Sequence, residues 1–111
     1  MDKITANAKI KAYLGFAAKT RSIASGADAV EQAIRAGKAK LVLICSQASN
    51  ATIERFSFAS STHSVKCVLV EDEALGQAIG KPERKIVCVL DNKFATAIIN
   101  EINLIDLGDK K

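Results

Sequence analysis

Five consecutive apolar residues, Leu41-Val42-Leu43-Ile44-Cys45, constrain the fold of this chain more than any other feature. The run is far shorter than the ~20 residues that cross a bilayer, and its length suits a β-strand. Because successive side chains of a strand point to opposite faces of a sheet, a strand without polar positions must be covered on both faces. The sequence therefore predicts a sheet with helices packed on each side.

Helical and extended patterns alternate along the rest of the chain. Helical spacing of apolar residues or helix-start signals occur in residues 10–18, 27–37, 49–62, 71–80 and 91–105, and extended runs in 21–24, 41–45, 65–70 and 85–90. This order predicts an α/β fold, namely a three-layer α/β/α sandwich with a mixed four-stranded sheet. We expect one domain over residues 1–107 and a disordered tail over residues 108–111.

The positive charge lies in the N-terminal third of the chain. Residues 1–40 hold eight Lys or Arg and three acidic residues, a net charge of +5. Residues 41–111 hold eight Lys or Arg and nine acidic residues, a net charge of −1. Such an excess attracts polyanions. No basic segment followed by a long apolar one opens the chain, so we expect a cytoplasmic protein with no membrane partner.

No catalytic constellation is visible in the sequence. Cys45, Cys67 and Cys88 stand about twenty residues apart in apolar runs, and His63 lies in a serine-rich stretch, so we interpret the cysteines as small buried hydrophobes rather than as a metal or thiol site. Segment 76–81 resembles a phosphate loop but has the wrong glycine spacing and a proline at the Ser/Thr position. We therefore expect a non-catalytic protein with no metal and no cofactor.

The start of the second predicted helix is the best candidate site. Ser25-Gly26-Ala27-Asp28 ends an extended piece and leaves free backbone N–H groups at the positive end of a helix, which favours anions. The cations Lys19, Arg21, Lys38 and Lys40 flank this element in the sequence. The alternative interpretation is an ordinary capped helix with a solvated basic surface.

Several strings also occur in the order found in a known family. They are Tyr13-Leu14-Gly15-Phe16-Ala17, Ile23-Ala24-Ser25-Gly26, Ala33-Ile34-Arg35-Ala36-Gly37-Lys38-Ala39-Lys40-Leu41-Val42-Leu43, Gln47-Ala48-Ser49-Asn50-Ala51-Thr52, Leu75-Gly76-Gln77-Ala78-Ile79-Gly80-Lys81 and Glu83-Arg84, and they span roughly residues 8–98. On these strings the chain resembles the YlxQ-like bacterial branch of the ribosomal protein L7Ae/L30e/Gadd45 family.

The resemblance implies an α/β/α sandwich that binds kink-turn RNA, a sharply bent duplex with sheared G·A pairs and an extruded nucleotide. It places the groove contacts on Gly26, Ala27, Asp28, Ala29 and Gln32, and the contact with the extruded nucleotide on the loop Lys81, Pro82, Glu83 and Arg84. We expect Ser25, Lys19, Arg21 and Lys38 to complete this RNA-binding site. The implied partners are ribosomal or other kink-turn RNA and ribosomal proteins, and we expect a monomer.

Three positions depart from the motif of the family's tightest binders, which usually carry Asn-Glu and then, after two residues, a Lys. This chain has Asp28, Ala29 and Gln32 there. A lost bidentate base contact costs ~1–3 kcal/mol, so we expect weaker affinity or a different preferred RNA. The same departures suit the alternative function, a protein-interaction module of the same fold with weak or no RNA binding.

Overall fold

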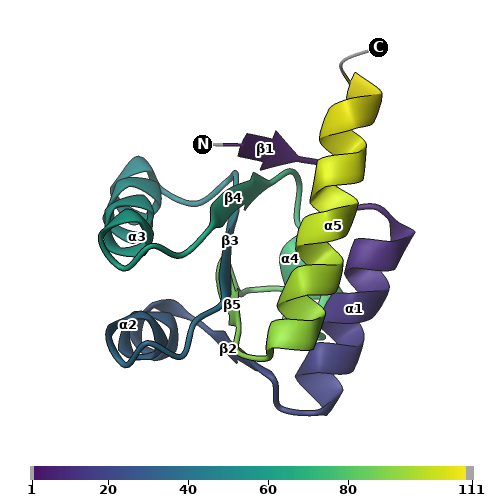
Figure 1. Cartoon of the computed structure of the whole chain (residues 1–111). Coiled ribbons are helices and arrows are strands. Elements are labelled where there is room, and N and C mark those ends of the chain that lie inside the picture. Colours follow the sequence, from purple (N-terminus) through teal and green to yellow (C-terminus); the bar gives the residue numbers. More distant parts are fainter. Residues whose placement is uncertain (1, 110–111) are drawn as a thin grey trace.

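The computed structural model describes residues 2–109 and has three layers (Figure 1). One sheet lies between α2 and α3 on one face and α1, α4 and α5 on the other. The elements are, in chain order, β1 (Asp2–Ile4), α1 (Ala8–Lys19), β2 (Ile23–Ser25), α2 (Ala27–Arg35), β3 (Leu41–Cys45), α3 (Asn50–Thr62), β4 (Cys67–Val70), α4 (Ala74–Ala78), β5 (Ile86–Val89) and α5 (Asn92–Asp109). From α1 onward, this agrees with the predicted order of helices and strands.

The sheet has five strands, so the predicted number of four was wrong. Its strand order is β1-β4-β3-β5-β2, with parallel pairs β1–β4 and β3–β4 and antiparallel pairs β3–β5 and β2–β5. The missing strand was β1, which has three residues, of which only Ile4 is buried. So short a segment shows no alternation that distinguishes an edge strand from a loop.

The apolar strand β3 is covered on both faces, as its sequence predicts. Leu41 and Leu43 belong to the core beneath α1, α4 and α5. Val42 and Ile44 belong to the second core beneath α2 and α3. All five residues of β3 are buried, so this strand holds the two helical layers together from the middle of the sheet.

Side chains cap three of the helices. Asn7 Oδ1 accepts a hydrogen bond from Ile10 N (2.9 Å) at the start of α1, and Ser49 Oγ accepts one from Thr52 N (3.1 Å) at the start of α3. Asp91 Oδ1 accepts from Lys93 N (2.8 Å) before α5. In contrast, α2 has a glycine, Gly26, at its N-cap position and has no side-chain cap among the described residues.

The ends of the elements differ from the predicted ones by at most four residues. The first extended run begins later, at Ile23, because Arg21 has φ +58° in the turn that follows α1. Helix α5 continues to Asp109, and it thus includes the first two residues of the predicted tail, 108–111; residues 110–111 lie outside the described residues. Among the helices of residues 2–109, none is both long and apolar enough to cross a membrane.

Candidate functional site

The start of α2 lies directly beside β5. Gly26, the N-cap residue, has φ +90° and ψ 158°. Its N–H donates to the carbonyl of Ile86 (2.9 Å), and its carbonyl accepts from Val30 N (3.1 Å). The N–H groups of residues 27–29 have no hydrogen-bond partner among the described residues. This helix end is therefore a free donor surface with a partial positive charge.

A cation from a distant part of the chain stands over this helix end. An added Cβ on Gly26 would overlap Nη1 of Arg84 and would lie 3.5 Å from Cζ. The Arg84 Nε is buried and has no hydrogen-bond partner among the described residues, because Glu83 Oε1 at 3.7 Å is too far away. A guanidinium with an unmet donor beside a positive helix end favours an anion between them.

A cavity of about 310 Å³ opens beside Arg84. It lies between the end of α1, strand β2, the end of α4 and the loop of residues 81–84, and it is lined by Ala18, Arg21, Ile23, Ser25, Ile79, Lys81 and Arg84. Three of these side chains are cationic and none is acidic, while alanine and isoleucine form an apolar wall. The cavity therefore suits a ligand with a flat or apolar part and a negative charge.

Gly76 positions the loop of residues 81–84, and sequence reasoning missed this role. An added Cβ on Gly76 would lie 2.7 Å from the carbonyl oxygen of Lys81, 2.8 Å from that of Pro82 and 3.0 Å from that of Arg84. The Gly76 carbonyl also accepts a hydrogen bond from Lys81 N (2.9 Å). The sequence signal was the glycine in segment 76–81, which we considered as a phosphate loop and as part of a family string but not as a support of this loop.

The structure brings together part of the predicted site. Arg21, Ser25, Lys81 and Arg84 line one cavity, and Gly26 touches Arg84 at its edge. On the first turns of α2, Ala27 is half-buried and Asp28, Ala29 and Gln32 are exposed; on the loop, Pro82 and Glu83 are exposed. These side chains therefore frame the free end of α2.

Two predicted cations lie away from this cavity. Lys38 follows the opposite end of α2, because nine helical residues separate the two ends by roughly 13 Å. Lys19 lines a neighbouring hollow of about 370 Å³ between α1 and α4. Proximity in sequence thus predicted the position of Arg21 but not those of Lys38 and Lys19.

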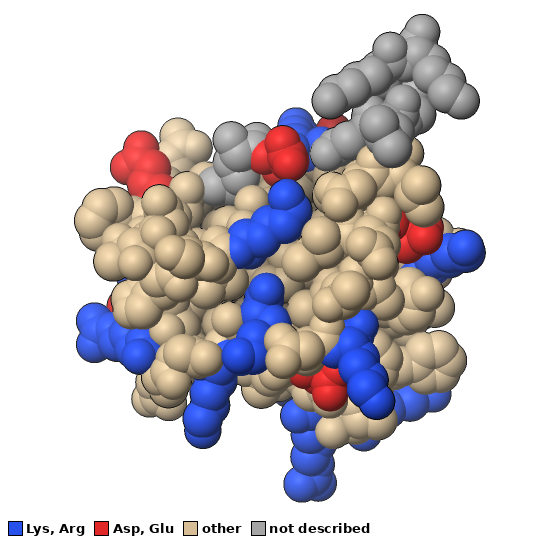
Figure 2. Space-filling model, in the orientation of Figure 1, with Lys and Arg blue, Asp and Glu red and all other residues tan. Residues whose placement is uncertain are grey.

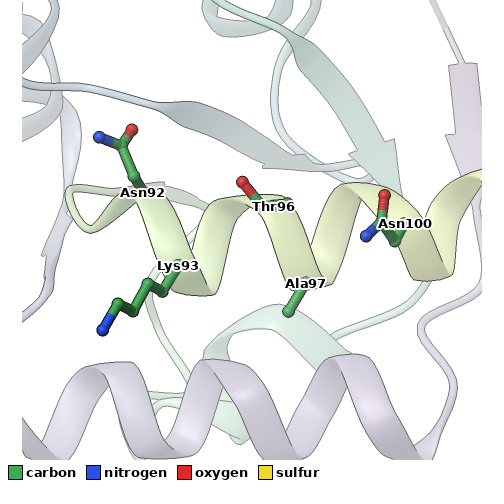
Figure 3. A pocket seen from close by; sticks show the side chains of 5 residues that line it. All are labelled: Asn92, Lys93, Thr96, Ala97 and Asn100. Carbon is green, nitrogen blue, oxygen red and sulfur yellow. The ribbon is translucent and has the colours of Figure 1, made fainter.

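Basic side chains dominate the surface around the end of α1. Figure 2 shows more Lys and Arg than Asp and Glu on the lower part of the face it presents, where α1 ends and β2 begins. A larger hollow of about 440 Å³ lies elsewhere, on the outer side of α5. Figure 3 shows that Asn92, Thr96, Ala97 and Asn100 line it with Lys93, the only charged residue of the set. The residues that line this hollow form no cluster of charged side chains.

The cysteines lie in the cores. Cys45 and Cys88 are buried and Cys67 is half-buried. Burial raises the pKa of the Cys88 thiol to about 11, against a smaller opposing effect of a hydrogen bond with the Ala24 backbone. Burial also raises the pKa of Cys67. Cys67 and Cys88 are therefore neutral thiols near pH 7. Within the described part of the chain, no three His, Cys, Asp or Glu side chains gather as metal ligands would.

Fold and site together define a small α/β/α protein with a basic cavity at the start of a helix. The chain belongs to the ribosomal protein L7Ae/L30e/S12e/Gadd45 family, because a sequence model of that family matches residues 8–99. The resemblance read from the sequence strings is thereby confirmed. Strand β1 lies outside the matched segment.

Two curated relatives carry the same name. The chain is 39% identical over 88 residues to the RNA-binding protein YlxQ of Bacillus subtilis (strain 168), covering 78% of this chain and 88% of that one. It is 35% identical over 83 residues to the RNA-binding protein YlxQ of Enterococcus faecium, covering 74% and 80%. Both relatives are named as binding proteins and not as enzymes, which agrees with the expected absence of catalysis.

Solved structures share the fold. A protein of unknown function from Bacillus halodurans superposes with a TM-score of 0.80 at 30% identity, over 87% of this chain and 99% of that one. The 15.5 kD RNA-binding protein of Giardia lamblia superposes with a TM-score of 0.75 over 93% and 92% of the two chains. At 18% identity, the second likeness concerns the fold alone.

Proposed function

We propose that this protein binds structured RNA of the kink-turn type and catalyses no reaction. The observation that carries the proposal is the meeting of the free end of α2 with the Arg84 guanidinium beside a cavity lined by three cations. The names of the relatives support RNA as the polyanion. The interface consists of the start of α2, the loop of residues 81–84 and Arg21 in the turn after α1.

In this proposal each part of the site meets a different part of the RNA. The free N–H groups at the start of α2 and the cations Arg21, Lys81 and Arg84 meet phosphates, which position the RNA. The exposed Asp28 and Gln32 reach base edges. The cavity receives the extruded nucleotide, since its volume is at the lower end of the ~300–1,000 Å³ of small-ligand pockets.

A gel-shift titration tests the proposal. A kink-turn duplex is compared with a control duplex in which Watson–Crick pairs replace the G·A pairs, and we expect tighter binding of the kink-turn. Arg84→Gln removes a cation at the cavity and should weaken binding and lower the salt slope by about 0.7–0.9. Arg35→Gln removes a cation at the far end of α2, 74% exposed, and serves as the matched control. Equal effects of the two variants would contradict this site.

Ribosomal RNA is the source of the kink-turn that we expect. Sedimentation of a cell extract through sucrose should then place the protein with ribosomal particles, and the association should weaken as salt is added. Recovery of the protein only at the top of the gradient, with kink-turn binding intact, would indicate another RNA.

The second candidate function is a protein-interaction module with weak or no RNA binding. It is favoured by the exposed Asp28 carboxylate at the start of α2, which opposes phosphate, and by Ala29 and Gln32, which supply no cation. Salt distinguishes the two functions, because RNA contacts weaken steeply with ionic strength and an apolar protein interface does so much less.

A further inference from the structure

We infer that the RNA surface continues beyond the cavity along the outer face of α1, where an unpaired base of a flanking single strand stacks on Phe16 between Lys9 and Lys19. The inference rests on the proposed function and adds to it a second class of RNA element, a single-stranded extension. Its basis is a stripe of solvent-exposed side chains on α1.

The stripe consists of Lys9, Ala12, Phe16 and Lys19. These residues follow one another at helical spacing, so they lie on one side of α1. All four are exposed, and Phe16 keeps 56% of its surface accessible. The opposite side of the helix, with Ile10 and Leu14, is buried in the core. Phe16 is therefore an aromatic ring that no part of the described fold covers fully.

The charge around Phe16 is positive. Helix α1 contains three lysines and no acidic residue. Within residues 2–105, no carboxylate forms an ion pair with Lys9 or Lys19. The third lysine, Lys11, lies off the stripe in a hollow that it shares with Asp72 and Glu73. The stripe itself thus presents an aromatic ring between two cations that have no ion-pair partner within residues 2–105.

A continuous surface joins the stripe to the cavity. The hollow of about 370 Å³ beside Lys19 is lined by Gly15, Ala18, Gln77, Ala78, Ile79 and Gly80 as well. Two of these residues, Ala18 and Ile79, also line the cavity of Arg21 and Arg84. A strand that leaves the cavity can therefore follow the hollow onto α1 without crossing an acidic side chain that lines either one.

The composition of the stripe fits single-stranded RNA better than a protein partner. Proteins that bind single strands combine cations that follow the backbone with aromatic rings on which bases stack. A protein interface would require a larger contiguous apolar patch, whereas the neighbours of Phe16 on the stripe are Ala12 and two lysines. Phe58 on α3 provides a contrast, since it is 74% exposed but the two arginines that line its hollow, Arg35 and Arg55, both form ion pairs with Glu31.

The test uses two RNAs and a matched pair of variants. The first RNA is the kink-turn duplex alone, and the second carries in addition a tail of about six uridines, placed at either end in separate molecules. Stacking of one base is worth ~1–3 kcal/mol by alanine substitution, which corresponds to about a fivefold to 150-fold change in affinity. We expect the tail on one end to tighten wild-type binding by a factor in this range.

Phe16→Ala should remove this gain and leave the affinity for the tailless duplex unchanged. Phe58→Ala, the control on the other layer, should change neither affinity. A 2-aminopurine placed in the tail should be quenched by the wild type and not by Phe16→Ala. A tail that adds no affinity, or equal effects of Phe16→Ala and Phe58→Ala, would overturn the inference. Either result would indicate that Phe16 contacts a protein partner instead of RNA. Failure of the tailless duplex to bind would instead overturn the proposed function.

Discussion

Replacing Gly26 by alanine tests how the backbone at the start of α2 is held. At φ +90° and ψ 158°, Gly26 lies in a region that is almost restricted to glycine, and an L-residue there costs of order 1–3 kcal/mol. The new Cβ would also overlap the Arg84 guanidinium. Because that group is the far end of a flexible side chain, it can move aside, so we expect the backbone to account for most of the loss of stability.

Thermal unfolding measures the effect. With an unfolding entropy of ~2.1 cal/mol/K per residue and 111 residues, 1 kcal/mol corresponds to about 4 °C. We therefore expect Gly26→Ala to lower the Tm by about 4–13 °C. Gly37→Ala provides a backbone reference, since Gly37 has φ +72° and no atom within 4 Å of its added Cβ.

The same substitution in an Arg84→Ala background separates the two causes. If the backbone dominates, Gly26→Ala lowers the Tm by the same amount in both backgrounds. A loss that disappears in the Arg84→Ala background would show that the collision dominates and that our reasoning on φ and ψ is wrong. A Tm for Gly26→Ala within about 2 °C of the wild type would refute both causes. RNA affinity should fall in Gly26→Ala, because Arg84 is displaced.

Three further predictions concern the loop, the motif and a core thiol. Gly76→Ala should lower the free energy of unfolding by ~1–3 kcal/mol, seen in urea melts, because its Cβ meets the carbonyl oxygens of Lys81 and Pro82 at 2.7 and 2.8 Å. Asp28→Asn should tighten kink-turn binding in gel shifts by removing a carboxylate that opposes phosphate; unchanged affinity would place the RNA elsewhere. The folded-state pKa of Cys88 is raised from 9.0 to about 11, so between these pH values only the unfolded chain ionises this thiol. The free energy of unfolding should therefore fall from about pH 9 to 11, and it should fall less in Cys88→Ala.

The sequence predicts the layers of the fold because local patterns determine them. The apolar run of β3 demands two covered faces, and the helical spacing in α1 and α5 supplies one of the covering layers. The edge strand β1 escapes prediction because its pairing with β4 joins residues 66 positions apart, such as Asp2 and Val68. A three-residue edge strand is specified by that contact and not by its own pattern.

The candidate site is predictable only in part for a related reason. Gly26 is visible as the start of a helix, and the loop of residues 81–84 is expected from the family resemblance. The contact between Gly26 and Arg84 depends on the antiparallel pairing of β2 with β5, which no local signal encodes. Lys38 shows the opposite case, since it is near the site in sequence and lies at the other end of α2.

The position of β2 at the edge of the sheet also bears on how the site moves. This strand has three residues and pairs only with β5, whereas β3 lies between two neighbours and is buried throughout. Segments with few neighbours open locally more often than the core of a sheet. Amide protons of β2 should therefore exchange with solvent sooner than those of β3. The hydrogen bond from Gly26 N to Ile86 O (2.9 Å) joins the start of α2 to this edge of the sheet. We therefore expect it to open together with β2, so that the start of α2 can adjust to a ligand while the two cores stay intact.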